Sequence, residues 1–270
     1  MSINYGYKEE IIEELSSIND NSNNWYNYKK LNILTKLKRP NQNLVVFFHG
    51  ALPNPEDRKC CFRGFNYEIE NTDIVCASDI LISIYQNFEI SWYFSTVKYN
   101  VNDIYIETFT YLLGKKNYKN VIFTGTSGGG YPSLYFASYF NKIALIANSQ
   151  IYPEHYWHFK TLQTRIKDND DELLYNDKDI ELYITKSNPS KIILYNNLKD
   201  DGLKYIMNAY YLPFITFIKT NKYENLLDLR LFEGEDPPEG KTHHHVNFPK
   251  DSSHLTVLKD IISFNNRSLS

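Results

Sequence analysis

The feature that most constrains this chain is a series of short, continuously apolar runs separated by amphipathic stretches. The runs 45–48 (Val-Val-Phe-Phe) and 143–146 (Ile-Ala-Leu-Ile) contain no polar side chain, which is typical of strands buried on both faces. Alternation of such strands with helical segments favours an α/β fold with a mostly parallel central sheet and helices on both faces. The predicted strands are 44–48, 73–77, 120–124, 142–147, 191–196 and 229–233, and the predicted helices are 103–113, 128–140, 202–211 and 251–264.

Two segments fall outside this alternation. The first forty residues predict a short helix at 9–16 and a strand-like segment at 28–37, which would add an edge to the sheet. Residues 151–188 begin with aromatic side chains and continue with an acidic stretch, so we expect an inserted helical cap over the site, with a plain surface excursion as the alternative. A length of 270 residues fits a single α/β domain over 1–270 that contains this insertion.

Composition narrows the expected partners and location. The net charge of -3, without a basic cluster, gives no reason to expect a nucleic-acid partner. No apolar run approaches the ~18 residues of a membrane span and no apolar signal segment opens the sequence, so we expect no membrane span and a cytoplasmic location. Three cysteines, including the adjacent Cys60 and Cys61, fit a reducing compartment and show no metal-ligand spacing. The 23 Tyr and 16 Phe fit either a sugar-binding surface or the codon bias of an AT-rich genome.

One glycine-rich turn marks a candidate active site. The strand at 121–124 leads directly into Gly125-Thr126-Ser127-Gly128-Gly129-Gly130, and a helix is predicted to follow. G-x-S-x-G between a strand and a helix is the pattern of a nucleophile elbow, in which the serine has a strained backbone and glycines let strand and helix pass closely. The alternatives are a turn without chemistry and a phosphate loop, but no Gly-Lys-Ser/Thr follows the glycines. We therefore predict that Ser127 is a catalytic nucleophile.

With the elbow, further motifs give the chain a resemblance to the α/β-hydrolase superfamily over nearly its whole length. Within the superfamily it looks most like a bacterial branch of serine esterases and O-acetyltransferases associated with surface polysaccharide. The elbow is the most specific of these motifs. The others are Phe48-His49-Gly50-Ala51, Ala77-Ser78-Asp79, Trp92-Tyr93, Asn148-Ser149-Gln150, Tyr195-Asn196-Asn197-Leu198-Lys199-Asp200 and His245-Val246-Asn247-Phe248-Pro249.

The resemblance implies an oxyanion hole and an acid. In this fold the loop after an early buried strand and the residue after the nucleophile donate backbone N–H groups, so Ala51 and Gly128 are assigned to the hole. His49 lies in the same loop and is interpreted as structural. The acid follows the nucleophile in chain order and stands just past a late strand, which indicates Asp200, with Asp201 as the alternate.

The base is expected among three adjacent histidines, 243–245, that precede the last predicted helix. His245 is favoured because it is nearest to the turn into that helix, and His244 is an alternate. His254 is the other alternate, although a position one turn inside a helix favours packing or exposure. Three adjacent side chains on an extended segment cannot all face one ion, so we predict no metal site and no cofactor.

These assignments predict a serine-dependent ester hydrolase or O-acyltransferase that forms an acyl-enzyme on Ser127. The expected substrate is a cell-surface glycan, its precursor or a small ester. The resemblance to capsule O-acetyltransferases implies acetyl-CoA as co-substrate if the reaction is acetyl transfer. The alternative is a non-catalytic glycan-binding or secretion-accessory protein on the same fold.

Overall fold

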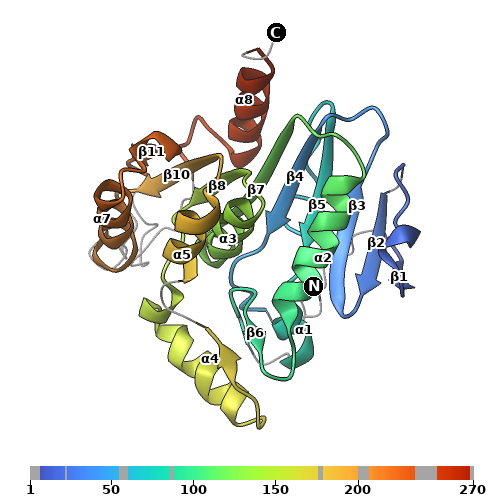
Figure 1. The fold of residues 1–270 in the computed structure, drawn as a ribbon, viewed down its shortest axis with the longest axis horizontal. Helices are drawn as coiled ribbons and strands as arrows, with labels where there is room; N and C mark the ends of the chain where they lie inside the picture. The colour runs from blue at the N-terminus through green and yellow to red at the C-terminus, as the bar shows by residue number, and fades with distance from the viewer. Residues whose placement is uncertain are drawn as a thin grey trace. The chain divides into compact units, whose positions relative to one another are not determined.

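The computed structural model describes residues 7–21, 23–54, 60–85, 88–175, 179–199, 207–234 and 248–267 (Figure 1). The chain divides into two compact units. The first consists of Met1–Val121 and Trp157–Asp177, and the second of Ile122–Tyr156 and Lys178–Ser270. The first change of unit, after Val121, falls inside one strand, β7 (Asn120–Thr126).

Among its described residues, the first unit contributes five strands to the large sheet, in the order β1-β2-β3-β5-β4. β4 and β5 are parallel, with Val45 opposite Ile74, and every residue of both strands is buried. β3 runs antiparallel to both of its neighbours, and β1 is parallel to β2. The bounds are β1 Glu9–Ile12, β2 Asn23–Tyr28, β3 Leu31–Lys36, β4 Asn43–Phe48 and β5 Thr72–Ala77, with a 3₁₀ turn at Leu15–Ser17.

The predicted helix at 9–16 is wrong, because β1 occupies Glu9–Ile12 and pairs with β2. A helix of two turns is marginal in water, and strand pairing outweighs its weak propensity. The strand-like segment at 28–37 is the second arm of a hairpin, β2–β3, whose turn residues Lys29 and Lys30 have φ values of 49° and 71°. The expectation that the first forty residues add an edge to the sheet is confirmed.

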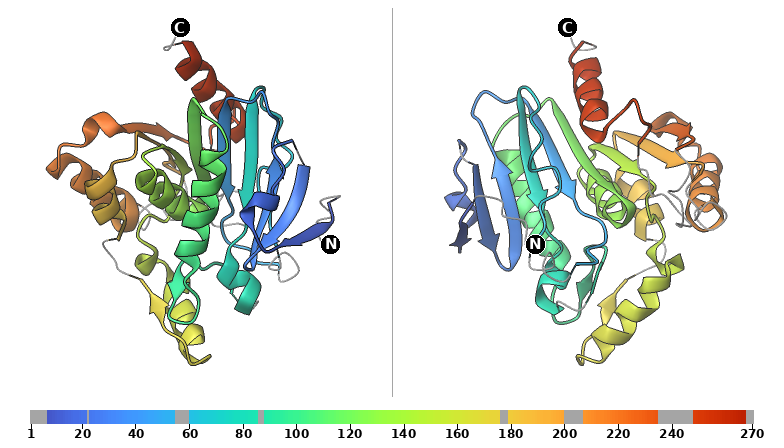
Figure 2. Two further views of the ribbon diagram at one scale, coloured as in Figure 1. Left: turned by 45° about the vertical axis from the view of Figure 1, so that its right-hand side comes forward. Right: turned by 180° about the vertical axis from the view of Figure 1, so that it is seen from behind.

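Helix α2 (Val101–Gly114) covers one face of the first unit's strands, as the two views of Figure 2 show. Its buried residues recur at helical spacing, and Phe109 meets Phe48 of β4 edge to face at 5.8 Å. The neighbouring Phe47 points to the other face, where its ring lies 5.4 Å from that of Tyr67. The short helix α1 (Ile80–Tyr85) follows β5 directly.

Part of the 151–188 segment belongs to the first unit. Helix α4 (Trp157–Lys167) is followed by β9 (Leu173–Leu174), which pairs antiparallel with β6 (Ser95–Thr96). The ring of Phe159 on α4 contacts Trp92 and Phe94 at 6.0 and 6.3 Å. Helix α5 (Asp179–Ser187) instead belongs to the second unit. Closure of this segment over a site stays a prediction.

The second unit contains four parallel strands in the order β7-β8-β10-β11. Helix α3 packs on β8 and α5, where the rings of Tyr135 and Tyr183 lie 4.4 Å apart. The bounds are β7 Asn120–Thr126, β8 Ile143–Ala147, β10 Lys191–Asn197, β11 Leu227–Phe232, α3 Gly130–Tyr139, α7 Leu212–Thr220 and α8 His254–Arg267, with short turns of helix at Ser127–Gly129, Pro153–His155, Met207–Tyr211 and Glu224–Leu226.

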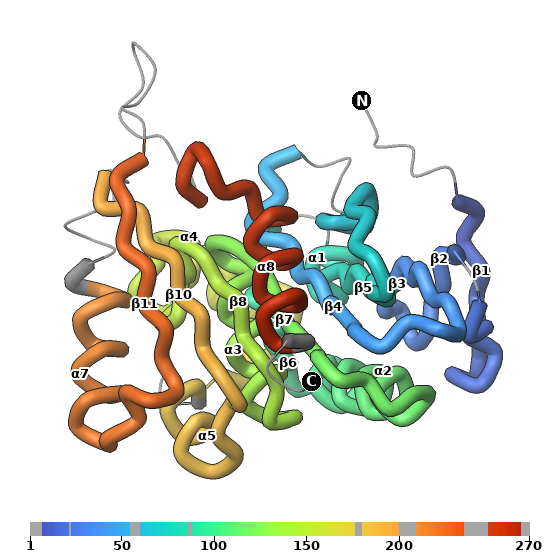
Figure 3. Tube along the Cα trace, turned by 90° about the horizontal axis from the view of Figure 1, so that it is seen from above, coloured from blue at the N-terminus to red at the C-terminus, as the bar shows by residue number. Residues whose placement is uncertain are grey.

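Helices α3 and α8 lie on opposite faces of β7 (Figure 3). Successive residues of a strand point to opposite faces. Thr124 is hydrogen-bonded to His254 of α8, whereas a Cβ on Gly125 would meet the start of α3. The prediction of an α/β fold with a mostly parallel sheet and helices is therefore confirmed. No helix among the described residues has the length and apolarity to cross a membrane.

Candidate active site

The predicted elbow has the geometry of a sharp strand-to-helix bend. β7 ends at Thr126, Ser127–Gly129 form one 3₁₀ turn, and α3 begins at Gly130. Ser127 has φ 54°, in the left-handed region that non-glycine residues rarely occupy. Its side chain is half-buried, while the flanking Gly125 and Gly128 are buried. The serine thus sits in strained backbone at the carboxyl end of a buried strand, as the glycine pattern predicts.

Two glycines make this bend sterically feasible. A Cβ at Gly125 would overlap the carbonyl group of Gly129 and lie 2.9 Å from Oγ of Ser133. A Cβ at Gly130 would overlap the side chain of Ser149, which follows β8. The close passage of strand, helix and neighbouring loop therefore explains why glycines are needed on both sides of the serine.

Gln150 is the hydrogen-bond partner of the Ser127 hydroxyl within the described residues. Its Nε2 donates to Oγ of Ser127 at 3.4 Å, and its main-chain N–H donates to the Ser127 carbonyl at 3.1 Å. The preceding Asn148 has φ 42° and accepts the main-chain N–H of Asn197 through Oδ1 at 2.8 Å. The end of β8 is thereby tied both to the elbow and to the end of β10.

The predicted acids lie just beyond a well-ordered strand end. Asn197 of β10 is 1% exposed, and its Oδ1 accepts the main-chain N–H groups of Lys199 and Gly234 at 2.9 and 2.8 Å. This cap fixes the direction in which the chain leaves the sheet toward position 200. Asp200 and Asp201 themselves lie outside the described residues, so their role stays a prediction.

His254, the other histidine alternate, is hydrogen-bonded to Thr124 and not to Ser127. Its Nε2 lies 2.8 Å from Oγ1 of Thr124, whose hydroxyl donates to the Leu145 carbonyl, so the imidazole is the donor to Thr124. The ring stacks on Phe248 at 4.8 Å, and burial lowers the pKa of His254 to about 4. This half-buried neutral imidazole packs α8 on β7. His243, His244 and His245 lie outside the described residues.

In the first unit, the loop predicted to supply an oxyanion donor begins with a buried histidine. His49 is 2% exposed; its Nδ1 donates to the Gly50 carbonyl at 2.8 Å and its Nε2 accepts the main-chain N–H of Asp79 at 3.0 Å. Burial lowers the pKa of His49 to about 4. A neutral ring engaged at both nitrogens fits the structural interpretation of His49. Ala51 follows it with a half-buried side chain, and Gly128 lies in the second unit, so their shared oxyanion hole stays a prediction.

Asp79 organises the turn that holds His49. Its carboxylate accepts the Ser91 hydroxyl at 2.5 Å and the main-chain N–H groups of Leu81, Ser91 and Tyr93 at 3.2 Å each. Burial raises the pKa of Asp79, and the hydrogen bonds from Ser91 and Tyr93 oppose that shift. Tyr93 Oη in turn accepts the His49 N–H at 3.0 Å and donates to the Ala77 carbonyl. The three sequence motifs that contain these residues therefore form one network.

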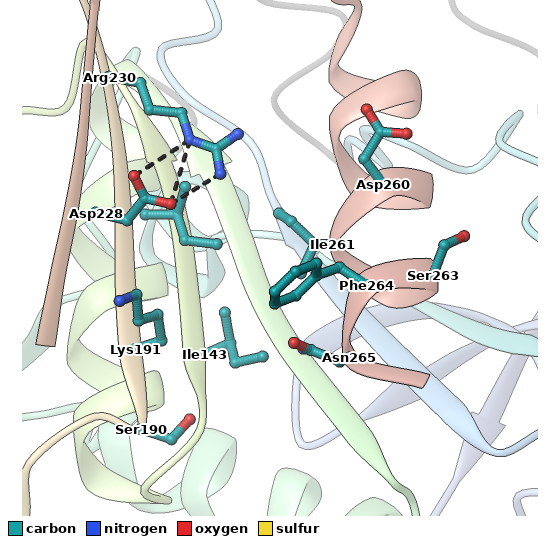
Figure 4. Close-up of a pocket in the computed structure, with 11 residues that line it drawn as sticks. Ile143, Ser190, Lys191, Asp228, Arg230, Asp260, Ile261, Ser263, Phe264 and Asn265 are labelled. Carbon is teal, nitrogen blue, oxygen red and sulfur yellow. Dashed lines mark hydrogen bonds and ion pairs between the residues drawn. The ribbon is translucent and has the colours of Figure 1, made fainter. Parts of the chain in front are cut away.

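A groove of about 880 Å³ lies between α8 and the strands β8, β10 and β11 (Figure 4). It is lined at the first residues of two strands, Ile143 and Lys191, whereas Ser127 follows the last residue of β7. On the face of the sheet that α8 covers, the groove extends along the strands as far as Arg230, which is level with Thr126 in the strand register. Arg230 on its wall is paired with Asp228 at 2.8 Å. Among the described residues no cluster of His, Cys, Asp or Glu is arranged to hold a metal ion.

No known protein-family model matches the sequence, and no curated protein matches it either. Solved structures do resemble the chain. The capsule O-acetyltransferase of Neisseria meningitidis serogroup A superposes with a TM-score of 0.56 at 14% identity, over 78% of this chain and 86% of that one. A ferulic acid esterase gives 0.50 at 12% identity, over 90% and 96% of the two chains. The Glycosylation Associate Protein (Gap123) complex from Streptococcus agalactiae gives 0.50 at 13% identity, over 75% of this chain and 40% of that one.

These likenesses show that the chain has the α/β-hydrolase fold. The resemblance to this fold that the sequence motifs suggest is thereby confirmed.

The sequence motif Asn148-Ser149-Gln150 did not predict a role for Gln150. One signal in the sequence could have indicated a role for it. Residues 148–150 are polar and directly follow an apolar strand, which is the next strand in the chain after the one that leads into Ser127. Consecutive parallel strands in an α/β sheet are commonly neighbours, so their carboxyl ends meet. Here Thr126 is opposite Ala147, which brings residues 148–150 beside Ser127.

Proposed function

We propose that this chain is a serine-dependent ester hydrolase or O-acyltransferase with Ser127 as the nucleophile. The observation that supports this most directly is the left-handed backbone of Ser127 at the end of a buried strand, with a half-buried side chain. Strain at a single half-buried residue that bears a nucleophilic hydroxyl is typical of a functional site. The fold that the chain shares with an O-acetyltransferase and an esterase agrees with this class of reaction.

In the proposed reaction the hydroxyl of Ser127 attacks an acyl carbonyl and an acyl-enzyme forms. Gly128 is the second residue of the turn of helix, where N–H groups have no acceptor one turn earlier. Its N–H, with that of Ala51, is proposed to bind the oxyanion. Water as the second nucleophile gives hydrolysis, and a hydroxyl of a glycan gives acyl transfer.

The proposed base and acid are His245 and Asp200, with His244 and Asp201 as alternates. The chain has seven histidines, and the four described ones have other contacts. His49 is buried, His254 is half-buried, and both are hydrogen-bonded elsewhere; His155 and His158 lie 3.9 and 3.5 Å from Glu154 and Glu89. We therefore propose 243–245 as the source of the imidazole, in agreement with the chain order of the fold.

The proposed substrate is a cell-surface glycan or its precursor, with acetyl-CoA as co-substrate if the acyl group is acetyl. The resemblance of the sequence motifs to surface-polysaccharide esterases and O-acetyltransferases supports this class of acceptor.

A fluorophosphonate probe tests the proposal directly, because it reacts covalently with activated serines. We expect stoichiometric labelling of the intact chain at Ser127, loss of labelling in Ser127→Ala, and full labelling in the control Ser263→Ala, which removes an exposed hydroxyl on α8. A folded wild type that stays unlabelled, yet binds glycan equally with and without Ser127, would favour the accessory protein over the enzyme.

A further inference from the structure

The side chain of Gln150 touches the atom on which the proposed function depends. Nε2 of Gln150 lies 3.4 Å from Oγ of Ser127 and donates to it. The side chain is 7% exposed, so this amide is largely withdrawn from solvent. A donor aimed at a nucleophilic oxygen in a water-poor place contributes more than the same donor in water.

The position of Gln150 does not depend on its own side chain. β7 and β8 end side by side, and the main-chain N–H of Gln150 donates to the Ser127 carbonyl at 3.1 Å. Asn148 is fixed from the other side, because its N–H donates to the Tyr195 carbonyl and its Oδ1 accepts from Asn197. A substitution of the Gln150 side chain therefore removes the donor and leaves these backbone contacts in place.

Resting on the proposed function, we propose that Gln150 is a catalytic residue whose side-chain amide stabilises negative charge on Oγ of Ser127. In acylation the base takes the Oγ proton, the Oγ electron pair forms the bond to the acyl carbon, and the carbonyl π pair moves onto its oxygen. Collapse expels the leaving group, which takes the proton from the imidazolium. Oγ bears partial negative charge while its proton is on the base.

In deacylation the same atom gains negative charge from a poorer starting acceptor. Water or a glycan hydroxyl loses a proton to the base and attacks the acyl carbon; the bond to Oγ then breaks, and Oγ leaves with the electron pair and regains the proton. The ester oxygen of the acyl-enzyme is a weak acceptor, whereas the departing oxygen is alkoxide-like. Hydrogen bonds to charged oxygens are about twice as strong as those to neutral ones.

The Gln150 donor therefore gains most in the deacylation transition state, and an interaction that strengthens on the way to the transition state is one that accelerates the step. Loss of the donor is expected to slow deacylation by roughly 10- to 100-fold and acylation by less than about 5-fold. The acyl-enzyme then accumulates.

Pre-steady-state hydrolysis of p-nitrophenyl acetate separates the two steps, since the burst reports acylation and the later linear phase reports deacylation. Gln150→Met keeps the length of the side chain without a donor, and Gln150→Glu keeps its shape with an acceptor in place of the donor. Ser149→Ala is the matched control, a buried neighbour whose hydroxyl has no hydrogen-bond partner among the described residues. Thermal unfolding shows which variants are folded.

We expect both Gln150 variants to keep a full burst and to lose the linear rate, with Gln150→Glu the slower, while Ser149→Ala matches wild type. Unchanged linear rates in the folded variants would overturn the role of Gln150 and leave the proposed function standing. Equal slowing of both phases would also overturn it, because it would assign Gln150 to holding the turn. A wild type with neither a burst nor fluorophosphonate labelling would overturn the proposed function and this inference together.

Discussion

Both units contain non-glycine residues with left-handed backbone, and two of these bends, one in each unit, are built differently. In the first unit Trp92 and Tyr93 have φ values of 51° and 63° and are 0% and 3% exposed. In the second, Ser127 has φ 54° and a half-buried side chain. The buried bend is over-determined by a carboxylate and a network of hydrogen bonds, whereas the elbow is held by glycines and one neighbouring loop. Backbone strain alone therefore does not indicate a catalytic residue, whereas backbone strain at an accessible nucleophile does.

The largest effect is expected from a substitution that disrupts the buried bend at Trp92 and Tyr93. Asp79→Ala leaves the Ser91 hydroxyl and three buried N–H groups without their acceptor, so we expect the free energy of unfolding to fall by about 3–5 kcal/mol. Denaturant unfolding measures the loss. Asp103→Ala is the matched control, because this exposed aspartate in the first turn of α2 is expected to cost less than about 1 kcal/mol. Equal effects of the two substitutions would contradict the role assigned to Asp79.

Acid is expected to destabilise both units through one neutral histidine in each, His49 and His254. The pKa of His49 and of His254 is about 4 in the folded chain, below the 6.5 of an unfolded one. Between these values the unfolded state binds more protons, so stability is full above about pH 6.5 and is lost as the pH falls toward 4. From pH 7 to 5 each histidine lowers the free energy of unfolding by about 2 kcal/mol.

The raised pKa of Asp79 acts in the opposite direction, so the histidine effect is measured as a difference between variants. His254→Gln keeps a donor for Thr124 and does not titrate. Its loss of stability between pH 7 and 5 is expected to be about 2 kcal/mol smaller than that of wild type. If the stabilities of wild type and His254→Gln fell by the same amount between pH 7 and 5, His254 would not be held neutral in the folded chain.

The smallest expected effect comes from glycine substitutions, which compare the backbone strain at Ser127 with that at Tyr93. Ser127→Gly relieves left-handed strain that Ser127→Ala retains, so the glycine variant is expected to be about 1 kcal/mol more stable than the alanine variant. Tyr93→Gly relieves the same strain but removes a buried ring and its hydrogen bonds, and is expected to lose about 3 kcal/mol or more. If Tyr93→Gly were instead more stable than wild type, the backbone strain at Tyr93 would outweigh the packing and hydrogen bonds of its side chain.

The sequence predicts well whatever depends on neighbouring residues. Continuous apolar runs located β4, β5, β7, β8, β10 and β11 to within a few residues, and the glycines around Ser127 predicted the bend. Structure that depends on distant pairing was missed. β1 is a strand because β2 lies beside it, and Trp157–Asp177 joins the first unit because Phe159 finds Trp92 and Phe94.

The candidate site follows the same rule. The elbow could be found from one stretch of sequence, whereas the contact of Gln150 with Ser127 requires knowing that β7 and β8 end together. The carboxylate of Asp79 likewise accepts from residues more than ten positions away, which no local pattern indicates.

The division of the first unit into two separate stretches of sequence also determines when its parts are translated. The first unit is interrupted after Val121 and resumes at Trp157, so β8 and α3 leave the ribosome before the rings of Phe159 and Tyr175 can reach Phe94. A nascent chain that stops at Val121 therefore holds an unfinished aromatic cluster. Completion of this cluster awaits translation of a segment encoded beyond the elbow.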